Sequence, residues 1–265
     1  MLLTSVILIL QEILEAAMLI SILAVISRQQ QRQLTWLPAG LLSGGILALL
    51  YAANMRSISE WFDYVGQEVV NAALQMSIAL AIVLLTWLVC AARARGSLEQ
   101  NRPGTSLDRR FVHVAALTIS LAVTREGSEI AVYLGGFMQQ PDKLQAVLTG
   151  SAIGAGIGIS FGFLIYYGLL ALRGRHGAWL PLLLLGLFCG NMLSQSALQL
   201  TQADLLPAGP FLWDSSAWLP ESSVIGRLLY ALVGYESRPS ALEVCAYLLG
   251  VSAVLVSAAL ARIRR

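Results

Sequence analysis

Two pairs of glutamates lie within apolar stretches that are each long enough to cross a bilayer. Glu12 and Glu15 lie within residues 2–27, and Glu126 and Glu129, preceded by Arg125, lie within residues 111–138. Residues three apart share one face of a helix. Charged groups at membrane depth are costly and mark functional sites. The spacing therefore predicts a cluster of carboxylates in the membrane interior, where their oxygens would suit a hard metal cation.

The composition assigns the chain to the polytopic membrane proteins. Of its 265 residues, 57% are hydrophobic and 12% are charged, whereas soluble domains carry about 25% charged residues. The net charge of +2 is spread over short connections, which argues against nucleic acid as a partner. The sequence contains no H-E-x-x-H motif and no nucleophile–base set, so we expect a protein that is not an enzyme.

Apolar stretches of roughly 20 residues or more predict seven transmembrane helices. We expect an all-α fold in which residues 1–265 form a single transmembrane permease domain. The first stretch lacks a basic region and a cleavage site, so we interpret it as a retained span and not as a signal peptide. The predicted spans are 2–27, 36–55, 69–92, 111–138, 144–172, 179–200 and 240–261, with a long outer segment at 201–239.

The arginines lie mostly on one set of connections, which predicts the orientation of the chain. By the positive-inside rule, the N-terminus is expected outside and the C-terminus in the cytoplasm, in a plasma membrane such as the inner membrane of a bacterium. The connections assigned to the cytoplasm carry Arg28, Arg32, Arg93, Arg95, Arg102, Arg109, Arg110, Arg173, Arg175, Arg262, Arg264 and Arg265, and the opposite ones carry Arg56, Lys143, Arg227 and Arg238.

The two glutamate pairs are expected at similar depth on antiparallel helices. Glu12 lies roughly 15 Å from the outer end of its span, and Glu126 lies roughly 22 Å from the inner end of its own. Both distances reach the middle of a hydrocarbon core about 30 Å thick. The pattern predicts an inverted repeat, about 1–92 against about 111–200, followed by an additional last helix at 240–261. Such transporters bind their substrate at the midplane, between the repeats.

The segments Arg125-Glu126-Gly127-Ser128-Glu129 and Glu12-Ile13-Leu14-Glu15-Ala16 resemble the paired R-E-G-x-E motifs of the high-affinity iron permease family, the oxidase-dependent iron transporters. The resemblance covers most of the chain. It implies import of iron, as ferric ion supplied by an extracytoplasmic ferroxidase, cupredoxin-like protein or iron-binding protein. It also implies that the four glutamates carry the iron and that Arg125 supports them. Iron is then the transported substrate, membrane lipid is the surrounding partner, and no permanently bound cofactor is expected.

The first motif departs from the family pattern at one position. Gln11 stands where the family usually has arginine, so the first glutamate pair has one cation fewer beside it. The departure makes the site more anionic by one unit, and it argues against treating the two motifs as equivalent.

Polar residues on the third and sixth predicted spans have two interpretations. Asn191 and Gln195 form a stripe on one span, while Glu68, Asn71 and the deeper Gln75 lie on the other. They could line the entrance or the path of the ion, with Glu68 the best entrance candidate because it is ionisable. The alternative is hydrogen bonding between helices.

Two further functions stay open at this point. One is a carrier for divalent cations such as manganese or ferrous ion. The other is a membrane subunit that transports nothing, in which the glutamate cluster is structural or relays protons, because buried charges often simply pair with one another. The glycines that recur every four residues in the fifth span predict a close-packed helix face and not a nucleotide loop.

Overall fold

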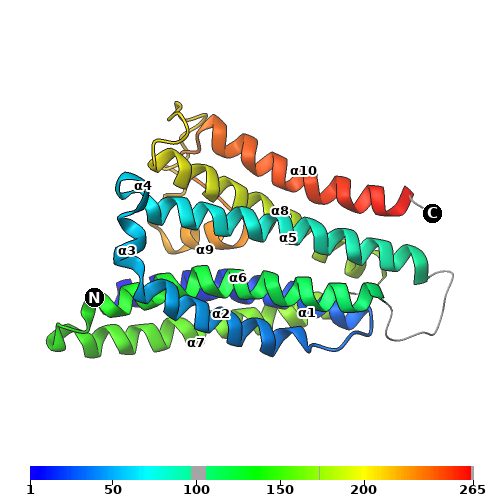
Figure 1. Ribbon diagram of the computed structural model, residues 1–265, viewed down its shortest axis with the longest axis horizontal. Helices are drawn as coiled ribbons and strands as arrows, with labels where there is room; N and C mark the ends of the chain where they lie inside the picture. Colours follow the sequence, from blue (N-terminus) through cyan, green and yellow to red (C-terminus); the bar gives the residue numbers. More distant parts are fainter. Residues whose placement is uncertain (97–105, 173, 264–265) are drawn as a thin grey trace.

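Long helices make up the molecule, which is known from a computed structural model that describes residues 1–96, 106–172 and 174–263 (Figure 1). Among these residues there is no strand, only an isolated bridge between Phe211 and Ser240. The helices are α1 (Leu2–Gln29), α2 (Trp36–Ala53), α3 (Met55–Ser59), α4 (Trp61–Tyr64), α5 (Gly66–Gly96), α6 (Ser106–Phe137), α7 (Pro141–Ala171), α8 (Gly174–Gln202), α9 (Val224–Val233) and α10 (Ala241–Ile263).

Each predicted span corresponds to one long helix, with ends that differ by a few residues. Of the described helices, α1, α2, α5, α7, α8 and α10 are long and apolar enough to cross a membrane. The exception is α6, which has 32 residues but carries Arg125, Glu126 and Glu129 in its middle. The prediction of an all-helical, multi-pass membrane protein is thus confirmed. Residues 97–105 of the predicted basic connection, with Arg173, Arg264 and Arg265, lie outside the described part.

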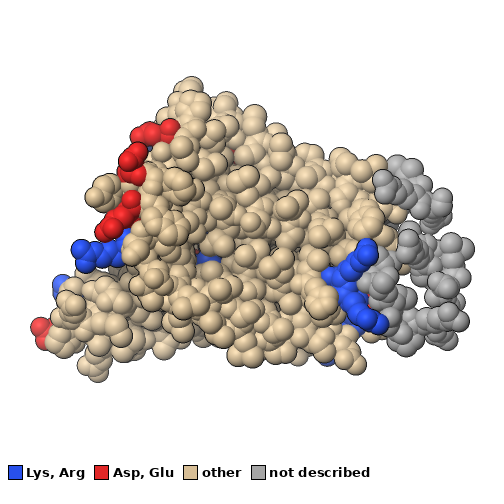
Figure 2. Space-filling model, viewed as in Figure 1, with Lys and Arg blue, Asp and Glu red and all other residues tan. Residues whose placement is uncertain are grey.

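The long helices run back and forth between two ends of the molecule. The N-terminus lies at the end that holds α3 and α4, and the C-terminus lies at the other end (Figure 1). Acidic atoms gather at the end with α3 and α4, where a few basic atoms also lie, and a group of basic atoms marks the opposite end (Figure 2). The described surface therefore shows the charge separation that the arginine pattern predicts.

Small residues let two helix pairs approach closely. α7 packs along α1, and α2 packs along α6. A Cβ added at Gly158 of α7 would lie 2.8 Å from Ile13 of α1, and one added at Gly44 of α2 would lie 2.7 Å from the Ser120 carbonyl of α6. The expected close-packed glycine face in the fifth span is confirmed, and α2 uses the same device. These contacts hold α1 and α6, the two glutamate-bearing helices, in place.

On α7 and α2, a glycine that packs against another helix and a nearby glycine that does not should respond differently to substitution. Gly158→Val should lower the thermal stability of the purified protein, because overpacking a tight contact typically costs about 1–3 kcal/mol. Gly156→Val should leave stability unchanged, since a Cβ there meets nothing within 4 Å. Melting curves in detergent measure both. Gly44→Val and Gly45→Val form a second matched pair, because Gly45 is equally open. Equal melting temperatures within each pair would contradict the packing role.

The outer segment contains a helix that the sequence analysis did not predict. α9 begins after Ser223, whose hydroxyl accepts a hydrogen bond from the Gly226 amide, and it ends at Gly234 in the left-handed conformation. These are ordinary capping signals. α9 is too short to span a bilayer, and it packs against α1 and α8. It therefore brings the outer segment onto the helix that carries Glu12 and Glu15.

Candidate functional site

The guanidinium of Arg125 joins three glutamates from two helices. Its Nη1 lies 3.0 Å from Glu15 of α1 and 2.7 Å from Glu126 of α6, and its Nη2 lies 3.5 Å from Glu129. Arg125 is only 6% exposed and Glu15 is 1% exposed. An antiparallel contact between α1 and α6 brings them together, and Tyr133 and Ser5 continue that contact with a 2.7 Å hydrogen bond. The two motifs thus form one buried site.

Glu12 completes the cluster and leaves one oxygen free. Its carboxyl group lies close to that of Glu126. One Glu12 oxygen, Oε2, is buried and has no hydrogen-bond partner among the described residues. Arg125 Nε is likewise buried without such a partner. A buried carboxylate oxygen without a partner is costly, and it is a position where a cation could bind.

The guanidinium of Arg125 occupies the space between the carboxylates, where a metal ion would otherwise bind. No group of three His, Cys, Asp or Glu side chains within the described residues is arranged as a ready metal site. The cluster holds four glutamates against a single arginine. A metal cation that entered would compete with Arg125 for the same oxygens.

A cavity of about 600 Å³ opens beside the cluster at the end of the molecule where α9 and the start of α10 lie. Gln11, the neighbour of Glu12, forms part of its wall. Five of the other lining residues are charged, namely Glu221, Arg227, Glu236, Arg238 and Glu243. We call this cavity the vestibule. It gives the glutamate-bearing part of α1 a water-accessible neighbour on one side.

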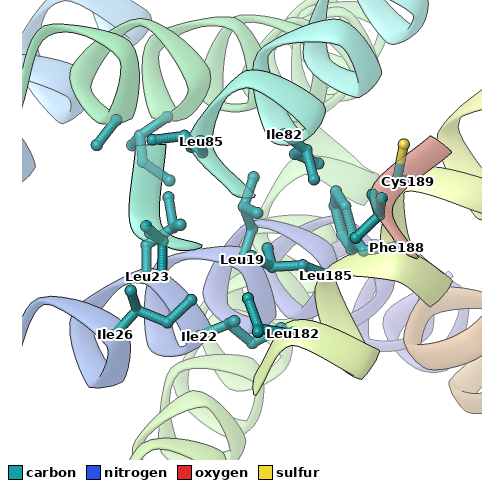
Figure 3. Close-up of a cluster of buried hydrophobic side chains, with 14 of the residues drawn as sticks. Leu19, Ile22, Leu23, Ile26, Ile82, Leu85, Leu182, Leu185, Phe188 and Cys189 are labelled. Atoms are coloured by element: carbon teal, nitrogen blue, oxygen red, sulfur yellow. The ribbon is translucent and has the colours of Figure 1, made fainter. Parts of the chain in front are cut away.

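Apolar side chains close the molecule on the opposite side of the cluster. Leu19, Ile22 and Ile26 of α1 meet Leu185 and Phe188 of α8 in a cluster to which α5 also contributes (Figure 3). Along α1 the order is Gln11 at the vestibule, then the glutamates, then this apolar cluster. Along α8 the order is Leu198 at the vestibule, then Gln195 and Asn191, then Phe188 and Leu185. The structure is therefore open toward one end and sealed toward the other.

Glu236 and Glu243 are paired on the vestibule wall. Ser240 and Glu243 cap the start of α10 reciprocally, with hydrogen bonds of 2.6 and 3.3 Å, a capping box that the sequence analysis did not use. Burial, together with the nearby Glu243 and Glu221, raises the pKa of Glu236 to about 8. Glu236 is thus neutral at acidic pH, and its carboxyl group lies close to that of Glu243.

The stability of this wall should depend on pH. The pKa of Glu236 is higher in the folded protein than its ordinary value of 4.5, so the pair stabilises the fold fully below about pH 4.5 and loses that contribution as the pH rises toward 8. The melting temperature of the purified protein should therefore fall between pH 5 and 8.5. Glu236→Gln, which stays neutral, should fall less over that range. An unchanged slope in this variant would contradict the assignment.

The remaining predicted residues form a second buried polar group. Asn71, Asn191 and Gln195 are each at most 3% exposed. Gln195 receives a 2.8 Å hydrogen bond from Gln75 and donates one of 3.2 Å to Asn191, while Asn71 accepts from Tyr51. The expected hydrogen bonding between helices is present. Glu68 lies in the first turn of α5 and does not line the vestibule.

Comparisons with known proteins agree with the residue pattern. The model of the iron permease FTR1 family matches residues 2–263. Among similar proteins are the ferrous iron permeases EfeU of Shigella sonnei and of Escherichia coli O157:H7, each 29% identical over 95% of this chain and 93% of their own. EfeU of Shigella flexneri serotype 5b is 32% identical over 68% of this chain and 80% of its own. No solved structure matches the chain.

Proposed function

The chain belongs to the iron permease FTR1 family, and on that basis we propose that iron crosses the membrane through the cluster of Glu12, Glu15, Glu126 and Glu129. The protein is a membrane iron transporter and not an enzyme. The observation that carries the proposed route is the free, buried Oε2 of Glu12 beside carboxylates held by Arg125. Carboxylate oxygens are suitable ligands for iron in either oxidation state.

Arg125 acts as an internal counter-ion in this proposal. While the site is empty, the guanidinium neutralises part of the charge on three glutamates, which would otherwise repel one another in a medium of low dielectric constant. When iron reaches Glu12, the cation competes for Glu15 and Glu126. The guanidinium then turns toward Glu129, the most exposed of the four, with 31% of its side chain accessible. The arginine thereby keeps the empty site stable without blocking it permanently.

The oxidation state of the entering ion has two candidates. The family resemblance implies ferric ion from a partner oxidase, which is the first candidate. The second is ferrous ion, and it is favoured by the similar proteins, which are named ferrous iron permeases. Uptake of iron held reduced with ascorbate, compared with uptake of ferric citrate, decides between them.

We propose that the chain is one domain of seven spans, with an inverted repeat and an additional α10. The packing of the helices supports this, because the second long helix of each repeat packs on the first helix of the other repeat. Thus α2 packs on α6, and α7 packs on α1. In both contacts glycines face the glutamate-bearing helix. We place the N-terminus and the vestibule outside. Labelling of a cysteine at position 221 in intact cells tests this orientation.

The proposed donor of iron is an extracytoplasmic protein, of ferroxidase, cupredoxin-like or iron-binding type. The vestibule supports this, since it is a polar opening lined by Gln11, the neighbour of Glu12. Glu68, Asn71, Asn191 and Gln195 remain proposed contributors to the entrance or the path. The charged residues of the vestibule favour an entrance beside α9 and α10 over one at Glu68.

The transport function is tested with purified protein in lipid vesicles. Vesicles that contain the protein should accumulate radioactive iron, and vesicles that contain the double variant Glu126→Gln, Glu129→Gln should not. No accumulation with either ferrous or ferric ion would favour the alternative of a non-transporting subunit. Accumulation of manganese in preference to iron would favour the divalent-cation carrier.

Gln11→Arg should reduce iron uptake at neutral pH. The side chain at position 11 lines the vestibule next to Glu12, so an arginine there adds a cation to the route of the entering ion. At acidic pH the variant should do relatively better than at neutral pH, when each is compared with the parent. Initial uptake rates at pH 5.5 and 7.5 measure this, with Gln11→Met as the uncharged control. Faster uptake than the parent at pH 7.5 would show that the missing arginine weakens this chain.

A further inference from the structure

Three buried amide side chains form one chain of hydrogen bonds across α5 and α8. Gln75 Nε2 donates to Gln195 Oε1 at 2.8 Å, and Gln195 Nε2 donates to Asn191 Oδ1 at 3.2 Å. Asn191 Nδ2 in turn donates to the Tyr230 carbonyl at 3.5 Å. Gln75 is fully buried, yet its Oε1 has no partner among the described residues. The chain therefore begins at an unpartnered carbonyl oxygen in the interior.

The same motif occurs in both halves of the sequence. Asn71 and Gln75 on α5 correspond to Asn191 and Gln195 on α8, with the same separation of four residues within each pair. Gln75 and Gln195 are 120 positions apart, as are Asn71 and Asn191. Related residues of an inverted repeat can contact each other only on the axis between the halves. The Gln75–Gln195 bond therefore lies on that axis.

The proposed repeat relates the two glutamate motifs in the same way. Glu12 and Glu126 are the first glutamates of the two motifs, and their carboxyl groups lie close to each other. If one axis in the membrane plane relates both contacts, the amides and the glutamates share one depth.

Two tyrosines contact the amides and interact electrostatically with the glutamates. Tyr51 donates to Asn71 at 2.9 Å and lies in the electrostatic field of Glu129. Tyr230, whose carbonyl binds Asn191, lies in the field of Glu15 and lines the vestibule. One end of the amide chain therefore meets, at Tyr230, a residue that interacts with Glu15 and lines the vestibule. It also lies next to the apolar cluster, since Met192 and Ile78, neighbours of these amides, belong to it.

We propose that the side-chain carbonyls of Gln75 and Gln195 form an uncharged second binding site for the iron ion, next to the glutamate cluster. The proposal rests on the proposed transport function. Carbonyl oxygens bind hard cations without adding charge, so this site holds the ion more weakly than the carboxylates do. Transport needs sites that are strong enough to admit an ion and weak enough to release it. The ion passes from the glutamates to the amides before the apolar cluster opens.

A charged substitution at the amides tests whether they bind iron or only hold α5 and α8 together. In Gln195→Glu the carboxylate still accepts the hydrogen bond from Gln75 Nε2. If the site binds iron, this variant should bind ferrous ion at least tenfold more tightly in anaerobic equilibrium dialysis, and its uptake should show a lower KM and a lower maximal rate. Gln75→Leu should keep iron bound at the glutamates but lower the maximal rate at least tenfold.

The control is Ser196→Ala. It removes a 3.2 Å hydrogen bond from α8 to the Ala72 carbonyl of α5, in the same interface but outside the amide chain, and it should bind and transport iron normally. Unchanged iron affinity in Gln195→Glu, while Glu126→Gln weakens binding at least tenfold, would overturn the second site and leave the proposed function intact. Parental iron affinity in Glu126→Gln would count against the function itself. If Gln195→Glu and Gln75→Leu both fail to fold while Ser196→Ala folds, the amides are structural and the proposal is wrong.

Discussion

Replacement of Glu126 by glutamine is expected to lower iron uptake by about 10- to 100-fold. Glu126 accepts from Arg125 at 2.7 Å through both of its oxygens, and its carboxyl group lies close to that of Glu12. The loss of one charge-assisted contact corresponds to about 1.5–3 kcal/mol, and each 1.4 kcal/mol is a factor of ten. The double variant Glu126→Gln, Glu129→Gln should abolish uptake.

The measurement is the initial rate of iron uptake in vesicles, normalised to the amount of protein inserted. Glu60→Gln is a suitable control, because Glu60 has 58% of its side chain exposed and forms only a 3.9 Å pair with Arg56. The control should transport at the parental rate. Glutamine has nearly the volume of glutamate, and Arg125 retains Glu15 and Glu129, so the variant should remain folded. Parental uptake by the double variant would refute the glutamate route.

Replacement of Arg125 by glutamine is expected to have the largest effect on stability. Its guanidinium is buried and serves Glu15, Glu126 and Glu129 together. Removal of one partner of a buried ion pair costs about 3–5 kcal/mol, because charge is left without compensation. The variant should therefore give little folded protein and no uptake. Arg125→Lys should be intermediate, since an ammonium keeps the charge but cannot reach several carboxylates in the geometry of a guanidinium.

A second substitution shows whether charge balance is the cause. Glu15→Gln added to Arg125→Gln removes one of the stranded carboxylates, and it should recover part of the lost melting temperature without recovering iron uptake. Melting curves and uptake rates of the four proteins of this cycle measure the coupling between the two residues. If the two single substitutions destabilise the protein additively, Arg125 and Glu15 do not stabilise each other.

The amino-acid sequence by itself determined the helices and the chemistry of the site. The apolar stretches place the long helices to within a few residues, because a helix in lipid satisfies its own backbone hydrogen bonds and depends little on its neighbours. The repeated E-x-x-E spacing placed the two carboxylates of each pair on one face of a helix. The glycines spaced by four residues indicated close packing, and Gly158 and Gly44 provide it.

Only the tertiary structure decided which groups meet. Arg125 binds Glu15, which is 110 positions away, and Gln75 binds Gln195 across a similar separation. Neither contact has a local signature, because both depend on how α1 packs against α6 and how α5 packs against α8. The same holds for the vestibule, whose wall includes the unpredicted α9. An opening at one end and an apolar seal at the other result from packing between distant helices, and residue type and spacing along the chain do not contain that information.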